Sequence, residues 1–338
     1  MAPKAKSKGA AGKIPQILGQ KEEIISKYHG NEKDHVSWPW LLIMKTKAYF
    51  YIISAAALWG LIGLFVKHLA SLGFTSIQIV ALRSISSAIC AVLALAPSVK
   101  ALFKIDWRDA WMFVGTGVIS LTFFNYCYFN CIAASSLAVA ALLLYTAPIF
   151  VMIMSVFLFR ESFTAKKAAA LIMTFAGCGC VTGAFSGSLS LTFTGLLYGL
   201  GSGFGYALYS IFGKYAVEKY SSATITIYTF FFASVAAIPI ANFPADTLAR
   251  INTEAIANVL GLGLICAVIP YLLYNKGLLY VDPGQASILA TIEPFVAAVI
   301  GICYFQEPLT AQKLVGMGLI FAAIILLNLP VRNLKLTK

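Results

Sequence analysis

Two charged side chains, Arg83 and Glu293, lie well inside long apolar stretches of the sequence. A charge at the centre of a membrane helix costs about 2.5–3.5 kcal/mol on insertion scales, so such a residue is expected to face a protein interior or a cavity. Glu293 has the chemistry to bind a cationic group or to exchange a proton with its surroundings. Its alternative role is structural, as an acceptor for backbone donors or as an ion-pair partner of Arg83.

Arg83 carries a planar set of donors that could hold an anion, such as a substrate carboxylate, through two parallel hydrogen bonds. In the alternative, its long side chain extends to the membrane surface. At about 1.5 Å per residue, Arg83 lies about 9 Å from the nearer end of its apolar stretch, and Glu293 lies about 12 Å from the start of its own. We therefore expect Glu293 near the membrane midplane and Arg83 closer to the surface.

Three aromatic side chains, Trp59, Tyr145 and Tyr206, fall near the midpoints of apolar stretches. They are too deep for the interfacial belt in which membrane proteins usually place aromatic residues. Such rings could stack on an apolar or aromatic substrate, or accept a cation over a ring face. Packing between helices is the alternative for each, and we expect some of the three to line a cavity.

Further polar and helix-breaking residues complete the candidate site. Asn125, Tyr271 and Asn275 could hydrogen-bond a substrate, or could join neighbouring helices. Pro148 and Pro294 each remove one backbone donor, which leaves a carbonyl free and kinks the helix. In a carrier, such breaks expose backbone to a cavity, although membrane helices also tolerate inert kinks.

The remaining reactive residues form no catalytic or metal-binding set. Two of the three histidines lie before residue 36 and the third, His68, lies at an expected helix end, so no nucleophile has a base beside it. All seven cysteines fall in apolar stretches, and Cys127 and Cys131, which share a helix face, have no histidine with them. We expect no enzyme activity, no cofactor, no metal and no disulfide.

The composition requires a membrane. The 338 residues are 60% hydrophobic and only 11% charged, whereas soluble domains average about 25% charged residues. Apolar runs recur at the length of about 20 residues that crosses a bilayer. We predict ten transmembrane helices, at 48–69, 77–97, 109–132, 136–158, 165–185, 194–215, 223–241, 255–276, 285–305 and 310–329.

Basic residues indicate the orientation in the membrane. With ten spans, 21 of the 25 lysine and arginine residues fall on the side of the two termini. The positive-inside rule therefore predicts cytoplasmic termini, most simply in the plasma membrane. The net charge of +12 then reflects topology, and we expect no nucleic-acid partner.

Both ends of the chain extend beyond the predicted spans. Residues 1–47 are predicted to form a basic cytoplasmic tail, disordered over 1–12, and residues 331–338 a short C-terminal tail. Apolar residues at near-helical spacing within 14–28 are consistent with an amphipathic helix on the membrane surface, or with a solvated segment of weak helicity.

An internal repeat organises the spans. Residues 144–167 align with 290–313 at an offset of 146, and 57–70 align with 204–217 at an offset of 147. The first alignment keeps a proline, a glutamate and a lysine in register: Pro148 with Pro294, Glu161 with Glu307, and Lys167 with Lys313. The predicted fold is all-α, with five helices in residues 48–185 and five in 194–330. An odd number of helices inserts the second copy upside down, as in many secondary transporters.

With these residues in view, the chain resembles the EamA-type members of the drug/metabolite transporter superfamily. The resemblance covers roughly residues 48–330. It rests on a mid-helix proline followed by an aromatic-x-Glu loop in each half (Phe159-Arg160-Glu161 and Phe305-Gln306-Glu307), on Trp59-Gly60 and on Arg83. It implies a carrier of small metabolites, often outward, that works by alternating access.

We therefore expect a secondary transporter of an amino-acid-like or amphipathic aromatic solute, acting as an exporter with its substrate site at the midplane. Its expected partners are that small molecule and the lipid bilayer, with possible proton coupling at Glu293. The alternative is a membrane ligand sensor or assembly factor on a carrier fold. The sequence has no repeated rings of like residues, which a channel would place along its pore.

Overall fold

The computed structural model describes residues 38–95, 103–185 and 192–328, and every regular element in these ranges is helical. The chain divides into two units, Met1–Thr46 and Lys47–Lys338, and the arrangement described below is that of the second. The segments 14–28 and 331–338, for which the sequence predicts a tail helix and a C-terminal tail, lie outside the described residues.

The first half of the chain contains helices of very unequal length, because several long helices are interrupted. In chain order they are α2 (Trp38–Gly60), α3 (Ile62–Ser71), α4 (Ser76–Leu95), η3 (Trp107–Asp109), α5 (Ala110–Val114), the π-helical η4 (Gly115–Thr122), α6 (Phe123–Ala134), α7 (Leu137–Leu144), α8 (Ala147–Phe159) and α9 (Ala165–Val181).

The second half repeats most of these interruptions, except the break between α2 and α3. Its elements are α10 (Phe193–Lys219), α11 (Ser222–Ala241), α12 (Ala245–Ala249), α13 (Thr253–Gly263), the π-helical η5 (Leu264–Val268), α14 (Ile269–Leu278), α15 (Pro283–Leu289), α16 (Ile292–Cys303) and α17 (Ala311–Asn328).

Eight helical segments among the described residues are long and apolar enough to cross a membrane: Ile43–Ser71, Ser76–Leu95, Trp107–Ala134, Leu137–Phe159, Ser222–Ala241, Thr253–Leu278, Pro283–Cys303 and Ala311–Asn328. The other two predicted spans coincide with α9, which has 17 residues, and with α10, which has 27. The protein is therefore a multi-pass, all-helical membrane protein, and the count of ten spans stays a prediction.

Interruptions occur at corresponding places in the two halves. The predicted fourth and ninth spans each break near the middle, between α7 and α8 and between α15 and α16, close to Pro148 and Pro294. The π-helical segments form a second pair, since η4 shifted by 147 residues would cover 262–269 and η5 occupies Leu264–Val268. Irregular backbone is tolerated inside a membrane only where protein or a cavity surrounds it.

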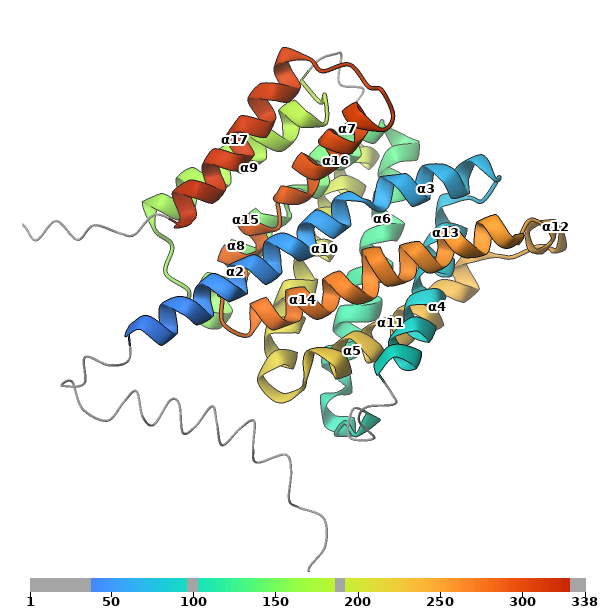
Figure 1. Ribbon diagram of the computed structural model, residues 1–338, viewed down its shortest axis with the longest axis horizontal. Coiled ribbons are helices and arrows are strands. Elements are labelled where there is room, and N and C mark those ends of the chain that lie inside the picture. Colours follow the sequence, from blue (N-terminus) through green and yellow to red (C-terminus); the bar gives the residue numbers. More distant parts are fainter. Residues whose placement is uncertain (1–37, 96–102, 186–191, 329–338) are drawn as a thin grey trace, which may run out of the picture. The chain divides into compact units, whose positions relative to one another are not determined.

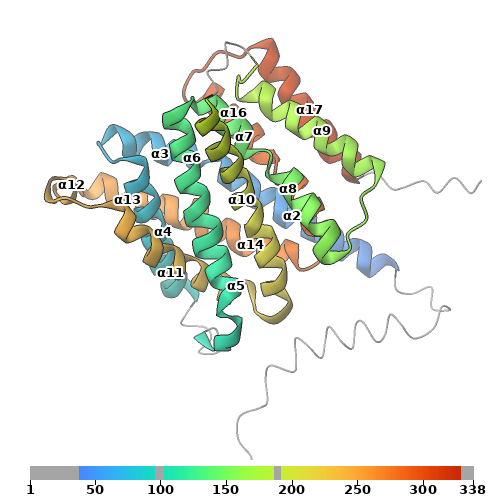
Figure 2. The same cartoon turned by 180° about the vertical axis from the view of Figure 1, so that it is seen from behind.

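Helices from the two halves pack in pairs. The last helix of each half, α9 and α17, lie side by side, and α4 packs against α11 in the same way. The loop from α8 to α9 and the loop from α16 to α17 lie at opposite ends of the α9–α17 pair (Figures 1 and 2). This antiparallel relation is the one expected of inverted repeats.

Small residues let α9 and α17 approach closely. A Cβ built on Gly316 would lie 2.7 Å from the carbonyl oxygen of Gly177 and 2.7 Å from the Cβ of Cys180. Two turns of backbone therefore meet without side chains between them, as is common between membrane helices. Gly318, on the same helix, has no neighbouring atom within 4 Å of such a Cβ.

This contrast yields a matched prediction. Gly316→Ala should force α9 and α17 apart and lower the free energy of unfolding by about 1–3 kcal/mol, the usual range for overpacking. Gly318→Ala, which adds the same methyl group in open space, should leave stability unchanged or slightly higher. Thermal unfolding of the two variants in one detergent measures the difference, and equal melting temperatures would contradict the close contact.

Candidate functional site

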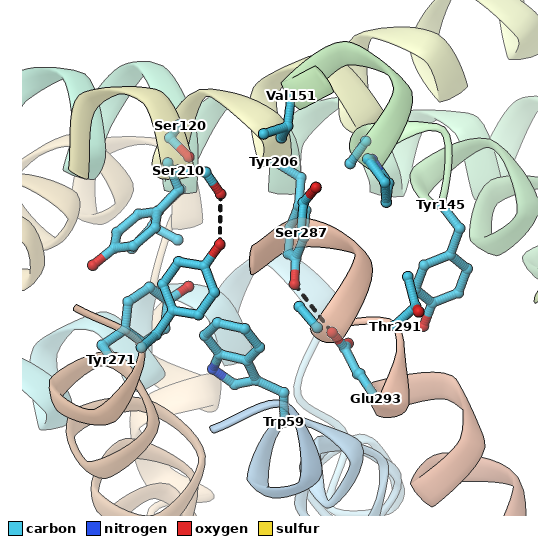
Figure 3. Close-up of a pocket in the computed structure, with 16 residues that line it drawn as sticks. Trp59, Ser120, Tyr145, Val151, Tyr206, Ser210, Tyr271, Ser287, Thr291 and Glu293 are labelled. Carbon is cyan, nitrogen blue, oxygen red and sulfur yellow. Dashed lines mark hydrogen bonds between the residues drawn. The ribbon is translucent and has the colours of Figure 1, made fainter. Parts of the chain in front are cut away.

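A small cavity lies where helices of the two halves meet, with side chains from α2, η4, α8, α10, α14, α15 and α16 around it (Figure 3). Its volume is about 20 Å³, which is enough for about one water molecule. The lining is mostly aromatic and hydroxyl-bearing: Trp59, Tyr145, Tyr206, Tyr209, Tyr271 and Tyr274 provide the rings, and Ser120, Ser210, Ser287 and Thr291 provide hydroxyl groups.

Glu293 is the one acidic residue in this lining. Tyr206 donates a hydrogen bond from its hydroxyl group to Glu293 Oε2 at 3.1 Å. Since Tyr206 comes from α10 and Glu293 from α16, this bond fixes the carboxylate against a second helix, as Figure 3 shows. The other carboxylate oxygen accepts no hydrogen bond from the part of the chain that the structure describes.

Trp59 presents a donor that has no acceptor. Its side chain is 6% exposed, and its indole Nε1 is buried without a hydrogen-bond partner among the described residues. The ring lies edge-on to Tyr271 at 5.2 Å and close to Tyr274 at 5.4 Å between centroids. Tyr206 completes the group, with its ring centroid 6.5 Å from that of Trp59.

A second layer holds the tyrosines in place. Asn275 is fully buried, and its amide group both donates to and accepts from the Tyr209 hydroxyl, at 3.0 and 3.2 Å. Tyr209 in turn packs edge-on against Tyr271, with the centroids 4.8 Å apart. Tyr274 is fixed by a 2.8 Å hydrogen bond with Ser210.

Most of the residues singled out from the sequence converge on this cavity. The ones that line it are Trp59, Tyr145, Tyr206, Tyr271, Glu293 and Pro148. Three others lie outside the lining. Asn275 supports Tyr209, Asn125 donates to the backbone carbonyl of Leu121 at 2.6 Å, and Pro294 is buried beside Glu293.

Arg83 does not reach the cavity. Its Nη2 donates to the carbonyl oxygen of Cys266 at 2.9 Å, inside η5, and its Nε is buried without a partner among the described residues. No ion pair joins Arg83 to Glu293, and among the described residues the Glu293 carboxylate accepts a hydrogen bond only from Tyr206. The anion-binding role therefore stays a prediction, and the contact observed is a structural one.

Two of the lining tyrosines were not predicted, although the sequence contains a signal for them. Tyr209 follows Tyr206 by three residues, and Tyr274 follows Tyr271 by three. Residues three apart share one helix face, so each unpredicted tyrosine continues a face that was already assigned to the site. The hydroxyl residues give no such signal, since serine and threonine occur throughout the chain.

The cysteines and histidine in the described part of the chain form no cluster of the kind that holds a metal ion. Cys127 and Cys131 are buried, and the Cys131 thiol contacts the carbonyl of Gly195. His68 lies in an exposed contact with Glu254 at 2.5 Å. These contacts are structural and lie away from the cavity.

Comparison with known proteins places this geometry in a family. Residues 46–183 and 193–329 each match the EamA-like transporter family. The chain belongs to this family. The tandem match also agrees with the internal repeat, and the resemblance to the drug/metabolite transporter superfamily is confirmed.

Relatives of this EamA-type chain are themselves named as transporters. An uncharacterized transporter of Archaeoglobus fulgidus is 33% identical over 213 residues, which are 62% of this chain and 75% of the relative. The threonine/homoserine exporter RhtA of Escherichia coli is 29% identical over 140 residues, 41% of this chain and 47% of RhtA. A crystal structure with a TM-score of 0.71 and 19% identity, covering 84% of this chain and 96% of its own, has the same fold. The EamA-type chain is therefore a membrane transporter.

The hydrogen bonding behind the cavity predicts a stability difference between two tyrosines. Tyr209→Phe should lower the free energy of unfolding by about 1–3 kcal/mol, because it leaves the buried amide of Asn275 without a partner. Tyr145→Phe removes a hydroxyl group that has no hydrogen-bond partner among the described residues, and should change stability little. Denaturant or thermal unfolding in detergent measures both, and an unaffected Tyr209→Phe variant would show that Asn275 has another partner.

Proposed function

We propose that the protein moves a small amino-acid-like or aromatic amino metabolite across the membrane, with the cavity around Glu293 as its substrate site. The observation that carries the proposal is the meeting of Glu293, Tyr206 and Trp59, which come from both halves of the chain. In transporters built from inverted repeats, substrate sites lie near the midplane at the interface of the repeats.

The chemistry of these groups favours an ammonium group beside an apolar or aromatic body. A carboxylate attracts a cation, and the surrounding rings stabilise a cation over their faces while excluding water. The unpaired donor of Trp59 suits a carboxylate or hydroxyl oxygen on the same molecule. RhtA, a partial relative, is named for threonine and homoserine, which carry these groups.

The size of the cavity supports alternating access. A cavity of about 20 Å³ cannot hold a metabolite, so the helices around it must separate for the substrate to enter and leave. The breaks between α7 and α8 and between α15 and α16 lie beside the cavity and provide places for such movement. In this proposal the termini are cytoplasmic, the protein lies in the plasma membrane, and net transport is outward.

Glu293 can also couple transport to protons, because its carboxylate can bind either a proton or the substrate. A single carboxylate cannot fully accommodate both a proton and an ammonium group, so binding of one disfavours the other. Proton entry from the opposite side would then release the substrate and couple the two movements. This extension of the proposal rests on the position of Glu293 as the one acidic group in the lining.

Counterflow in proteoliposomes tests the role of Glu293. Vesicles loaded with unlabelled threonine or phenylalanine should take up the labelled amino acid through the wild-type protein. Glu293→Gln should lower this exchange at least tenfold, because hydrogen bonds and contacts to a charged group are worth about 1.5–3 kcal/mol. Any residual exchange should lose its dependence on pH.

Glu218→Gln is the matched control, since Glu218 is exposed near the end of α10 and does not line the cavity. It should exchange at the wild-type rate within about twofold. Unchanged exchange and pH dependence in Glu293→Gln would contradict the proposed site. Binding of the amino acids without any exchange by the wild-type protein would instead identify a sensor.

Trp59→Phe tests the recognition of the second substrate group. The substitution keeps an aromatic ring but removes the unpaired N–H donor and part of the packing of the larger indole, a loss that both test ligands share. It should therefore weaken the binding of phenylalanine several-fold more than the binding of phenethylamine, which lacks the carboxylate. Competition with labelled phenylalanine measures both affinities, and an equal loss for the two compounds would show that Trp59 acts by packing alone.

A further inference from the structure

The two aromatic-x-Glu loops have the same local structure at opposite ends of the bundle. The middle residue of each triplet adopts a left-handed conformation, with φ of 54° at Arg160 and 55° at Gln306. Each glutamate receives a lysine side chain from the following helix, Lys167 at 2.7 Å and Lys313 at 3.0 Å. These loops are therefore two copies of one structural motif in opposite orientations.

Their long-range contacts differ sharply. The Glu161 side chain is 1% exposed, and its Oε2 accepts a hydrogen bond from the backbone N–H of Gly284 in α15 at 3.0 Å. The Glu307 side chain is 40% exposed and contacts Lys67 on α3 at 3.3 Å. Glu161 thus ties its loop to the other half of the chain through a buried contact, whereas Glu307 makes only partly exposed ion pairs.

The internal repeat shows which residue at the Glu307 end corresponds to Gly284. At the offset of 146, Gly284 corresponds to Ala138, at the start of α7. Among the described residues, the Glu307 carboxylate accepts only from Lys67 and Lys313, and the Glu307 backbone N–H donates to the Gly301 carbonyl, so Glu307 does not reach α7. Glu161 therefore reaches the opposite half through a buried backbone hydrogen bond, whereas Glu307 reaches it only through the partly exposed Lys67.

The surrounding helices show the same asymmetry. At the Glu161 end, α8 packs against both α15 and α10, and an apolar cluster with Val151, Ala207 and Ile211 fills the space between α8 and α10. At the Glu307 end, α16 approaches α2 closely at Gly60, where an added Cβ would lie 2.7 Å from the Val296 Cβ, but α16 makes few contacts with α3 and almost none with α7. The Glu161 end is therefore the closed end of the cavity, and the Glu307 end is the looser one.

We propose that Glu161 is the latch that holds one end of the carrier closed, and that Glu307 takes the corresponding position near Ala138 when the opposite end closes. The inference rests on the proposed function only in that alternating access requires each end to open in turn. Release of Glu161 from Gly284 would let α8 separate from α15 and open the Glu161 end.

Gly284 is part of this latch because a side chain there would obstruct it. A Cβ at position 284 would lie 2.8 Å from both carboxylate oxygens of Glu161 and 2.8 Å from the Met152 Cε. The corresponding residue, Ala138, already has a Cβ, so Glu307 cannot approach its backbone as closely. The latch at the Glu307 end is accordingly the weaker of the two, which favours the state in which the Glu161 end is closed.

A cysteine at position 152 reports on the latch. Met152 is 2% exposed on α8, lies against Gly284 and does not line the cavity. In full-length protein carrying Met152→Cys, the rate of labelling by a small polar maleimide should rise about tenfold when Glu161→Gln is added, since a hydrogen bond to a charged group is lost. Gly284→Ala should raise the rate in the same direction while Glu161 is kept.

Glu307→Gln in the same background is the matched control, and should leave the labelling rate at position 152 within about twofold. Peptide mass spectrometry locates the label, and the native Cys178, which is fully buried in α9, should stay unlabelled in every variant. Equal rates in all variants, or an equal rise in Glu307→Gln, would overturn the latch. A rise at Cys178 together with position 152 would assign Glu161 to general stability and would also overturn it.

No transported substrate takes part in this experiment. A negative labelling result therefore contradicts the latch and leaves the proposed substrate site standing. Conversely, failed counterflow of amino acids contradicts the substrate class and leaves the labelling result interpretable.

Discussion

A helix that breaks inside a membrane leaves backbone groups unpaired, and each must find a partner within the protein because lipid offers none. This constraint explains the polar contacts around the cavity. At the break after α7, the Thr146 hydroxyl donates to the Leu143 carbonyl at 2.6 Å, and at the corresponding break after α15, the Thr291 hydroxyl donates to the Ile288 carbonyl at 2.6 Å. Arg83 does the same for Cys266 in η5. At the two breaks these hydroxyl donors add to the backbone hydrogen bonds that remain, since the carbonyls of Leu143 and Ile288 also accept from the N–H groups of Thr146 and Thr291.

The inverted repeat supplies a nearly symmetric frame, and the site departs from it. Trp59 and Tyr206 are corresponding residues of the first and sixth predicted spans, and their rings meet beside the cavity. Ala147 corresponds to Glu293 at the offset of 146, so one half contributes a methyl group where the other contributes the carboxylate. In the proposed site, a small asymmetric solute would therefore be held in one orientation by unlike groups on matching helices.

The sequence was sufficient to predict the repeat, the helical class and six of the sixteen residues that line the cavity, for physical reasons. Charged and aromatic residues such as Glu293, Trp59 and Tyr206 are costly or unusual at membrane depth, so their position alone points to an interior role. The breaks at Tyr145 and Ala290 and the π-helical segments could not be predicted in detail, because they depend on which neighbouring side chain supplies a donor. Arg83 illustrates this, since its partner is the Cys266 carbonyl in the π-helical segment of another helix.

The broken helices also connect the cavity to the end that Glu161 closes. Ser287 lines the cavity from α15, and Gly284, one turn earlier in the same short helix, holds Glu161. On the facing side, α8 begins beside the cavity at Pro148 and ends at the loop that carries Glu161. A break separates α15 from α16, and another separates α8 from α7. A substrate that displaces Ser287 or Pro148 as it binds would shift the two sides of the latch relative to each other, which gives the site a direct mechanical link to the closed end.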